Sequence, residues 1–195
     1  VGYCIIALGG LSLLLALFKI REVASFQTAK PTVVDEVLNA LIEGDEAKAR
    51  TTAKSVPGVC SQMLLVGIER VNERREIIEE LLFQKILEVR PNLERFLAFL
   101  ALSAAAAPLM GLLGTVIGMI KTFQLITIYG TGDPKGLASG ISEALVTTEF
   151  GLIVAIPILV VHGLLSRMAR QKIGQLEQVA ISFVNGIHGI QNKDS

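Results

Sequence analysis

Two glutamates and three threonines in the second half of the chain have residue types and spacing suited to moving a cation. Glu143 and Glu149 interrupt an apolar stretch at 137–166, and Thr147 and Thr148 lie between them. Thr115 lies in the preceding apolar stretch. A charged side chain at the centre of a bilayer costs about 2.5 to 3.5 kcal/mol, so such residues usually face a bundle interior or a wet cavity. The pattern therefore predicts a polar pathway for water or an ion.

Simpler interpretations of the same residues stay open. Glu143 can lie near the outer interface, where a charge keeps most of its hydration, whereas Glu149 is near the middle of its stretch. A threonine in a membrane helix often donates its hydroxyl to the carbonyl four residues earlier, which uses the donor within the helix. A non-conducting membrane scaffold, in which these side chains serve only helix packing, is therefore the alternative to a pathway.

Small residues and prolines recur in the same two stretches. Gly111, Gly114 and Gly118 are three or four residues apart, a spacing that lets another backbone approach closely. That face can pack against other copies of the chain or within one subunit, and a closely packed bundle is expected. Pro108 and Pro157 lie inside the two stretches, where each removes a backbone hydrogen bond and is expected to kink its helix.

The composition of the chain excludes several classes of protein. The chain is 51% hydrophobic and 18% charged, with 18 basic and 18 acidic residues and a mean hydropathy of +0.57. Zero net charge excludes the basic footprint that nucleic-acid binding requires. No nucleophile–base constellation or phosphate-binding loop is present, so we expect neither an enzyme nor a cofactor. Cys4 and Cys60 form no CxxC motif, so no metal site is expected.

Three apolar stretches are long enough to cross a membrane, which predicts an all-α membrane protein. Residues 96–120 contain no charged side chain and would form about 37 Å of helix, more than the roughly 30 Å of a bilayer core. Lys19, Arg21, Arg167 and Arg170 follow the first and third stretches, which places the N-terminus outside and the C-terminus in the cytoplasm. The predicted segments are membrane helices at 1–20, 96–128 and 137–166, a cytoplasmic helical region at 21–95, an outer turn at 129–136, and a cytoplasmic C-terminal helix and tail at 167–195.

The charged region between the first two spans is predicted to form helices. One begins at Pro31 and closes at Gly44, and a second is capped by Asp45 and stopped by the Pro-Gly pair at 57–58. Apolar residues then recur with a helical period over 59–90. We expect Pro91 to kink this helix without ending it, so that the second membrane helix continues the cytoplasmic one.

The two apolar stretches that contain the candidate residues resemble a known family. APLMGLLGTVIGMIKTF at 107–123 and GISEALVTTEFGLIVAIP at 140–157 are similar to the two signature segments of the MotA/TolQ/ExbB proton-channel family. The first span resembles that of long-form ExbB-type members, which have an extra periplasmic N-terminal region. Because the chain starts at Val1 without the basic n-region of a signal peptide, we expect a fragment or a processed chain.

The resemblance implies an inner-membrane motor subunit of a Gram-negative bacterium. Such a subunit is expected to form a homo-oligomeric ring, here a pentamer, around a dimer of an ExbD/TolR-like or MotB-like single-span partner that supplies the titrating aspartate. Proton flow would then energise TonB-dependent transport across the outer membrane through a TonB-like protein. The alternatives within the family are a TolQ-like envelope-integrity subunit and a MotA-like flagellar stator.

The same resemblance implies roles for individual residues. Thr115 and Thr148 match the pore-lining threonines of the family, and Glu143 matches its functional glutamate near the outer end of the third helix. Pro108 and Pro157 match the helix prolines implicated in coupling ion flow to the partner. This chain is therefore expected to supply the wall of the pathway.

Two residues leave alternatives open. The position of Glu149 is commonly small or apolar in the family, so this side chain is either a feature of this branch or a residue at a subunit contact. Thr147 beside Thr148 leaves the choice between proton and sodium open, because both hydroxyls belong to the candidate pathway.

Overall fold

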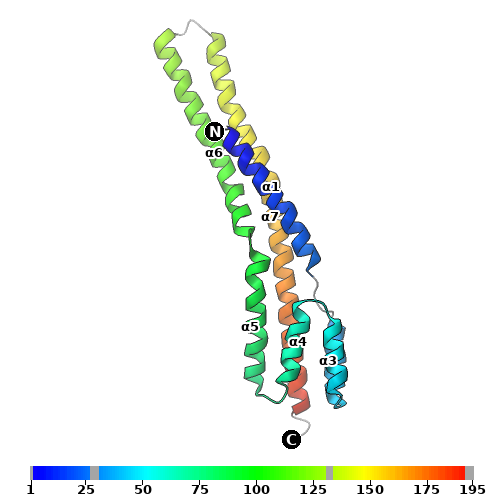
Figure 1. The fold of residues 1–195 in the computed structure, drawn as a ribbon. Helices are drawn as coiled ribbons and strands as arrows, with labels where there is room; N and C mark the ends of the chain where they lie inside the picture. Colours follow the sequence, from blue (N-terminus) through cyan, green and yellow to red (C-terminus); the bar gives the residue numbers. More distant parts are fainter. Residues whose placement is uncertain (1, 27–30, 131–133, 192–195) are drawn as a thin grey trace. The chain divides into compact units, whose positions relative to one another are not determined.

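The computed structural model describes residues 2–26, 31–130 and 134–191, and all regular secondary structure in these residues is helical (Figure 1). The chain divides into two compact units. The membrane unit comprises residues 1–21 and 96–166, and the polar unit comprises residues 22–95 and 167–195. The expected all-α membrane fold is confirmed.

The membrane unit contains three helices that are long and apolar enough to cross a bilayer. They are α1 (Gly2–Ser25), α6 (Leu97–Tyr129) and α7 (Pro134–Gln191), of which α1 and α7 continue into the polar unit. The 33 residues of α6 rise about 50 Å, so this helix exceeds the roughly 30 Å hydrocarbon core. Large apolar side chains such as Leu109 and Ile120 are more than half exposed, as a lipid-facing surface requires.

One face of α1 is buried within the membrane unit. Its buried residues are spaced alternately by four and three, as in the seam of a left-handed coiled coil. They are Ile5, Gly9, Ser12, Ala16 and Lys19. A methyl group on Gly9 would lie 2.9 Å from Cγ1 of Val154, so α1 packs closely along α7 at a small residue.

Helices α6 and α7 approach each other along a row of small residues. A methyl group on Gly151 would lie 2.7 Å from the carbonyl oxygen of Ala107, and one on Gly111 would lie 3.0 Å from Cα of Thr148. Gly118 faces α7 in the same way. The structure therefore places this small-residue face against the neighbouring helix of the same chain.

The third predicted span and the C-terminal helix form one element. Helix α6 ends beside Gly130, whose φ of 68° suits glycine, and α7 begins at Pro134. Helix α7 then runs without interruption to Gln191, with Pro157 inside it. Residues 131–133 of the predicted outer turn and 192–195 of the tail lie outside the described residues.

The polar unit contains four shorter helices together with the C-terminal part of α7. They are α2 (Pro31–Ile42), α3 (Glu46–Ser55), α4 (Val59–Glu69) and α5 (Arg75–Glu94), and each contacts the next. Helix α3 begins as predicted, because Asp45 accepts a hydrogen bond from the backbone N–H of Lys48 at 2.9 Å. In the core, the ring of Phe183 lies directly against Gly67.

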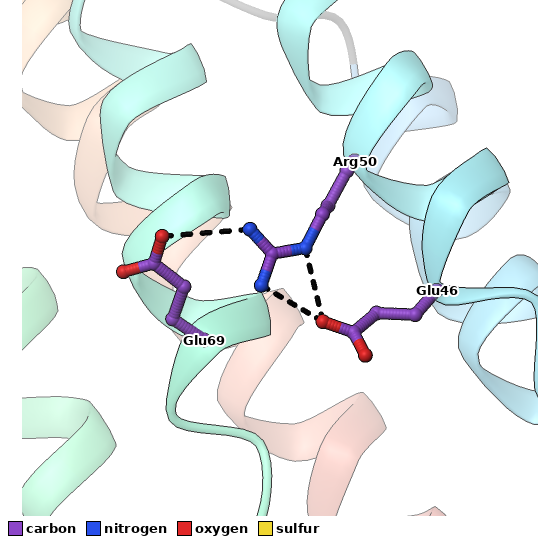
Figure 2. A network of polar contacts seen from close by, with 3 residues as sticks. All are labelled: Glu46, Arg50 and Glu69. Atoms are coloured by element: carbon purple, nitrogen blue, oxygen red, sulfur yellow. Dashed lines mark hydrogen bonds and ion pairs between the residues drawn. The ribbon is translucent and has the colours of Figure 1, made fainter.

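Ion pairs at the surface join α3 to α4 (Figure 2). The guanidinium of Arg50 donates to Oε1 of Glu46 at 2.8 and 2.9 Å and to Oε1 of Glu69 at 3.5 Å. The hydrogen bond with Glu46 is the main cause that raises the pKa of Arg50. A hydrogen bond to Glu43 likewise raises the pKa of Lys48. These groups are exposed to solvent, so the ion pairs fix local geometry more than they stabilise the unit.

The helix predicted over 59–90 is two helices in the structure, so this part of the prediction is wrong. Helix α4 ends at Glu69 and α5 begins at Arg75, and the N–H of Glu73 donates to the carbonyl of Arg70 in the turn between them at 2.9 Å. Figure 1 shows the two helices side by side. Because the buried residues of both helices face one core, the apolar pattern in the sequence continues from α4 into α5 although the helix does not.

The interruption between α5 and α6 also differs from the prediction. Pro91 lies inside α5, and the break falls later, at Arg95 and Phe96. Phe96 has a φ of 66°, in the left-handed region that costs an L-residue roughly 1–2 kcal/mol. Pro91 therefore does not end its helix, as predicted, but the expected uninterrupted helix into the membrane is wrong, because Arg95 and Phe96 separate α5 from α6. Pro91 has no N–H to donate to the carbonyl four residues earlier. Because Pro91 is exposed, that carbonyl can hydrogen-bond to water.

Candidate functional site

Packing between α6 and α7 brings two of the predicted pathway threonines to one depth. Gly111 of α6 lies against Thr148 of α7, and Gly114 lies against Thr147. The two helices run in opposite directions (Figure 1), so Thr115, which follows Gly114, is level with Thr147 and Thr148. The structure therefore places the two threonines that the family resemblance marks as pore-lining at similar depth on neighbouring helices.

The threonine hydroxyls at this depth differ in what they bind. The hydroxyl of Thr115 donates to the carbonyl of Leu112 at 2.7 Å, and that of Thr147 donates to the carbonyl of Ala144 at 2.6 Å. The hydroxyl of Thr148 is buried and has no hydrogen-bond partner among the described residues. A buried polar group without a partner is unfavourable, so Thr148 has the one hydroxyl among these three threonines whose hydrogen-bonding capacity is unused.

The two candidate glutamates are both exposed but lie on different faces of α7. Six residues at about 100° each separate Glu143 from Glu149 by about 120° around the helix. Glu149 directly follows Thr148, whereas Glu143 borders a cavity together with Thr147. One chain therefore does not place all five candidate residues on a single face.

A cavity of about 560 Å³ lies between α1, α6 and α7, near the end of the membrane unit where α6 leads into α7, here called the hairpin end. This volume is within the roughly 300–1,000 Å³ of small-molecule sites. Thr115, Thr148 and Glu149 do not border it. Its wall includes Tyr3 and Ile6 from α1, Ile117, Lys121, Thr122 and Leu125 from α6, and Glu143, Thr147 and Phe150 from α7.

Sequence reasoning did not mark Lys121 or Tyr3 as residues of this cavity. Lys121 is the only charged residue in 96–128, and a lysine within a membrane helix is costly enough to have marked a site. Together with Glu143 it gives the cavity wall two opposite charges. Tyr3 had no such signal, because the position of α1 along the other two helices is not visible in the sequence.

The described residues 2–26, 31–130 and 134–191 contain no group of three or more His, Cys, Asp or Glu side chains that could hold a metal ion. The candidate residues at this site are hydroxyls and carboxylates, with Lys121 in the cavity wall. Such groups can order water or bind a monovalent cation weakly enough to release it.

The helices that contain the candidate residues coincide with a family match. Residues 55–178 match the model of the MotA/TolQ/ExbB proton channel family, which is more than half of the chain. The chain belongs to this family. The family match includes α6 and all five candidate residues on α6 and α7, and it leaves out α1. The wall that Tyr3 and Ile6 contribute to the cavity therefore lies outside the region shared with the MotA/TolQ/ExbB family model.

Curated relatives come from two branches of the MotA/TolQ/ExbB family. The chain is 37% identical over 117 residues to the biopolymer transport protein ExbB of Aquifex aeolicus, covering 60% of this chain and 78% of that protein. A putative ExbB homolog of Methanothermobacter thermautotrophicus is 26% identical over 178 residues, covering 91% of this chain and 63% of the homolog. The Tol-Pal system protein TolQ of Pseudomonas aeruginosa is 33% identical over 132 residues, covering 68% of this chain and 53% of that protein.

Proposed function

We propose that this chain is the channel-forming subunit of an inner-membrane motor that uses the proton motive force to energise TonB-dependent transport across the outer membrane. The observation that supports this most directly is the buried hydroxyl of Thr148, which lacks a partner in the described part of the chain and lies level with Thr115. The sequence identity of 37% over 117 residues to an ExbB protein supports the transport role.

The proposed pathway uses the candidate residues unequally. Thr148 and Thr115 form its centre, where the free donor of Thr148 binds the ion or its water. Glu143 and Thr147 act at the hairpin end, and Glu149 acts beside Thr148, toward a neighbouring copy. Gly111, Gly114 and Gly118 hold α6 against α7, and Pro108 and Pro157 remain the proposed coupling positions.

The proposed assembly is supported by two features of the single chain. Its membrane unit has a lipid-facing surface of large apolar side chains, and its candidate residues lie on more than one face. We therefore propose a homo-oligomeric ring, a pentamer, around a dimer of an ExbD/TolR-like single-span partner that brings the titrating acid, with a TonB-like protein receiving the work. The ring lies in the bacterial inner membrane, with the N-terminus periplasmic and the C-terminus cytoplasmic.

Proton flux in proteoliposomes tests the pathway. The chain is co-purified with a candidate ExbD/TolR-like single-span protein, and flux is measured under an imposed potential. Thr148→Val keeps the shape of the side chain and removes the hydroxyl, so flux should fall at least about tenfold if one hydrogen bond to a charged species is lost. Thr148→Ser should retain most of the flux.

The matched control is Thr127→Val, because this exposed hydroxyl on α6 donates to its own helix, at the carbonyl of Phe123. Flux in this variant should equal that of the parent. Assembly with the single-span protein is checked by size in every variant. Unchanged flux in both Thr148→Val and Glu149→Ala would reject the pathway and favour the non-conducting scaffold.

A TolQ-like envelope-integrity role is the second candidate, supported by the 33% identity to the Pseudomonas aeruginosa protein. A MotA-like flagellar stator is the third. The three roles require different partners. Deletion of the gene in its host, followed by assays of TonB-dependent uptake, detergent sensitivity and motility, separates them by which trait is lost.

A further inference from the structure

The cavity between α1, α6 and α7 has a polar part and an apolar part at different depths. Thr122 packs against Gly140, and these two residues border the cavity near the hairpin end together with Leu125, which lies about 6 Å nearer that end than Lys121. Ile117 lies about 6 Å deeper than Lys121, and Phe150 lies about 10 Å deeper than Glu143, as the helical rise requires. Both charged side chains therefore lie in the part of the cavity nearer the hairpin end, beside Leu125, and Ile117 and Phe150 give the deeper part an apolar wall.

The hydroxyls in the cavity wall are already used. Thr122 donates to the carbonyl of Gly118 at 3.0 Å, and Thr147 donates to the carbonyl of Ala144 at 2.6 Å. The side chains of Lys121 and Glu143 differ, because neither forms an ion pair with another residue of the part of the chain that the structure describes. Two opposite charges therefore remain to be matched at this end of the cavity.

The cavity is open to the surroundings of the membrane unit. On its rim, Tyr3 is 90% exposed, Ile6 56% and Phe150 41%. These residues belong to spans whose outer surface is apolar, so the cavity opens toward lipid. A molecule of the bilayer can enter it sideways and needs no passage through water.

We infer that this cavity binds one membrane phospholipid whose headgroup has both a phosphate and a primary ammonium, as in phosphatidylethanolamine. The ammonium of Lys121 donates to the phosphate, and the carboxylate of Glu143 accepts from the headgroup ammonium. One acyl chain lies along Ile6, Ile117 and Phe150. The two charges of the headgroup thus match the two unpaired charges of the wall, and its chain matches the deeper apolar surface.

Other lipids match this wall less well. An anionic glycerol headgroup would satisfy Lys121 but offer no cation to Glu143. A choline headgroup has the positive charge without an N–H donor, so it cannot hydrogen-bond to the carboxylate. The inference therefore predicts a preference among headgroups, in addition to binding of lipid in general.

Native mass spectrometry of the full purified chain tests this preference. The chain is titrated in detergent with phosphatidylethanolamine, phosphatidylcholine or phosphatidylglycerol of identical acyl chains. Phosphatidylethanolamine should bind about tenfold more tightly than either, since one charge-assisted hydrogen bond distinguishes it. The headgroup without acyl chains should compete poorly.

Two variants act on the two parts of the cavity. Lys121→Gln should weaken phosphatidylethanolamine binding about tenfold through loss of the phosphate contact. Ile6→Trp, at a half-exposed position of α1, should fill the apolar part and reduce binding while both charges remain. Lys135→Gln is the matched control, because this exposed lysine near the start of α7 does not border the cavity and its loss should leave binding unchanged.

Equal binding of the three lipids, or preference for phosphatidylglycerol, would overturn the inference. Unchanged binding in both Lys121→Gln and Ile6→Trp would also overturn it, as would full competition by the free headgroup. Circular dichroism of each variant confirms that the helices remain folded. The readout needs no ion flux and no second protein. The inference can therefore fail while Thr148→Val still abolishes proton flux, and the converse result is equally distinguishable.

Discussion

At the scale of single residues, hydrogen bonding separates threonines that look equivalent in the sequence. Residue type and depth predicted the group of Thr115, Thr147 and Thr148, and the structure places them at one level. Which hydroxyl lacks an acceptor was not predictable, because it depends on how Thr148 packs against Gly111. The presence of Lys121 and Glu143 in the wall of one cavity depends on packing in the same way.

Backbone contact at Gly151 gives a prediction at this scale. A methyl group there would lie 2.7 Å from the carbonyl oxygen of Ala107, and neither backbone can move away without shifting a helix. Gly151→Ala should therefore destabilise the chain in detergent by about 1–3 kcal/mol, as overpacking usually does, and lower its thermal unfolding temperature.

Gly163→Ala is the control for this substitution, because it lies on the same helix of the membrane unit and a methyl group would meet nothing within 4 Å. Its unfolding temperature should stay the same or rise, since alanine favours helix over glycine. An equal loss of stability in both variants would show that the loss at Gly151 does not come from the close approach of α6 and α7.

At the scale of helices, the sequence predicted where α3 begins better than it predicted which stretches form one continuous helix. The cap at Asp45 is local chemistry, and α3 begins there. The apolar period over 59–90 is compatible with one helix or with two helices that share a core, and the structure has two. A continuous helix was predicted through Pro91, and α5 does continue past this exposed proline, but the chain is interrupted at Phe96, where the sequence has no break signal.

The cap of α3 gives a prediction for this scale. Asp45→Ala removes the acceptor for the backbone N–H of Lys48, and losing such a cap costs about 1 kcal/mol. Amide hydrogen exchange in the first turn of α3 should become roughly fivefold faster in the full chain. Asp35→Ala, an exposed aspartate inside α2, should leave exchange in its own helix nearly unchanged. Equal acceleration in both helices would contradict the capping role.

At the scale of the whole molecule, the distribution of charge predicted the three membrane helices, because a bilayer admits few charged residues. Of the 18 lysines and arginines, all but Lys19, Lys121 and Lys135 fall in segments predicted to be cytoplasmic, and Lys19 is at the cytoplasmic end of the first predicted span. The cavity was beyond this reasoning. It forms where three helices from distant parts of the sequence meet, and composition does not fix how α1 sits along α7.

The same charge distribution predicts how the chain is oriented in the membrane. In a background with Cys4→Ser and Cys60→Ala, Lys135→Cys and Lys54→Cys each introduce one exposed thiol, in the membrane unit and in the polar unit respectively. Because basic residues favour the cytoplasmic side, a membrane-impermeant maleimide should label Lys135→Cys in intact spheroplasts and label Lys54→Cys only after lysis. Labelling of Lys54→Cys before lysis would contradict the proposed topology. The arginines and lysines that follow the first and third spans would then lie on the periplasmic side.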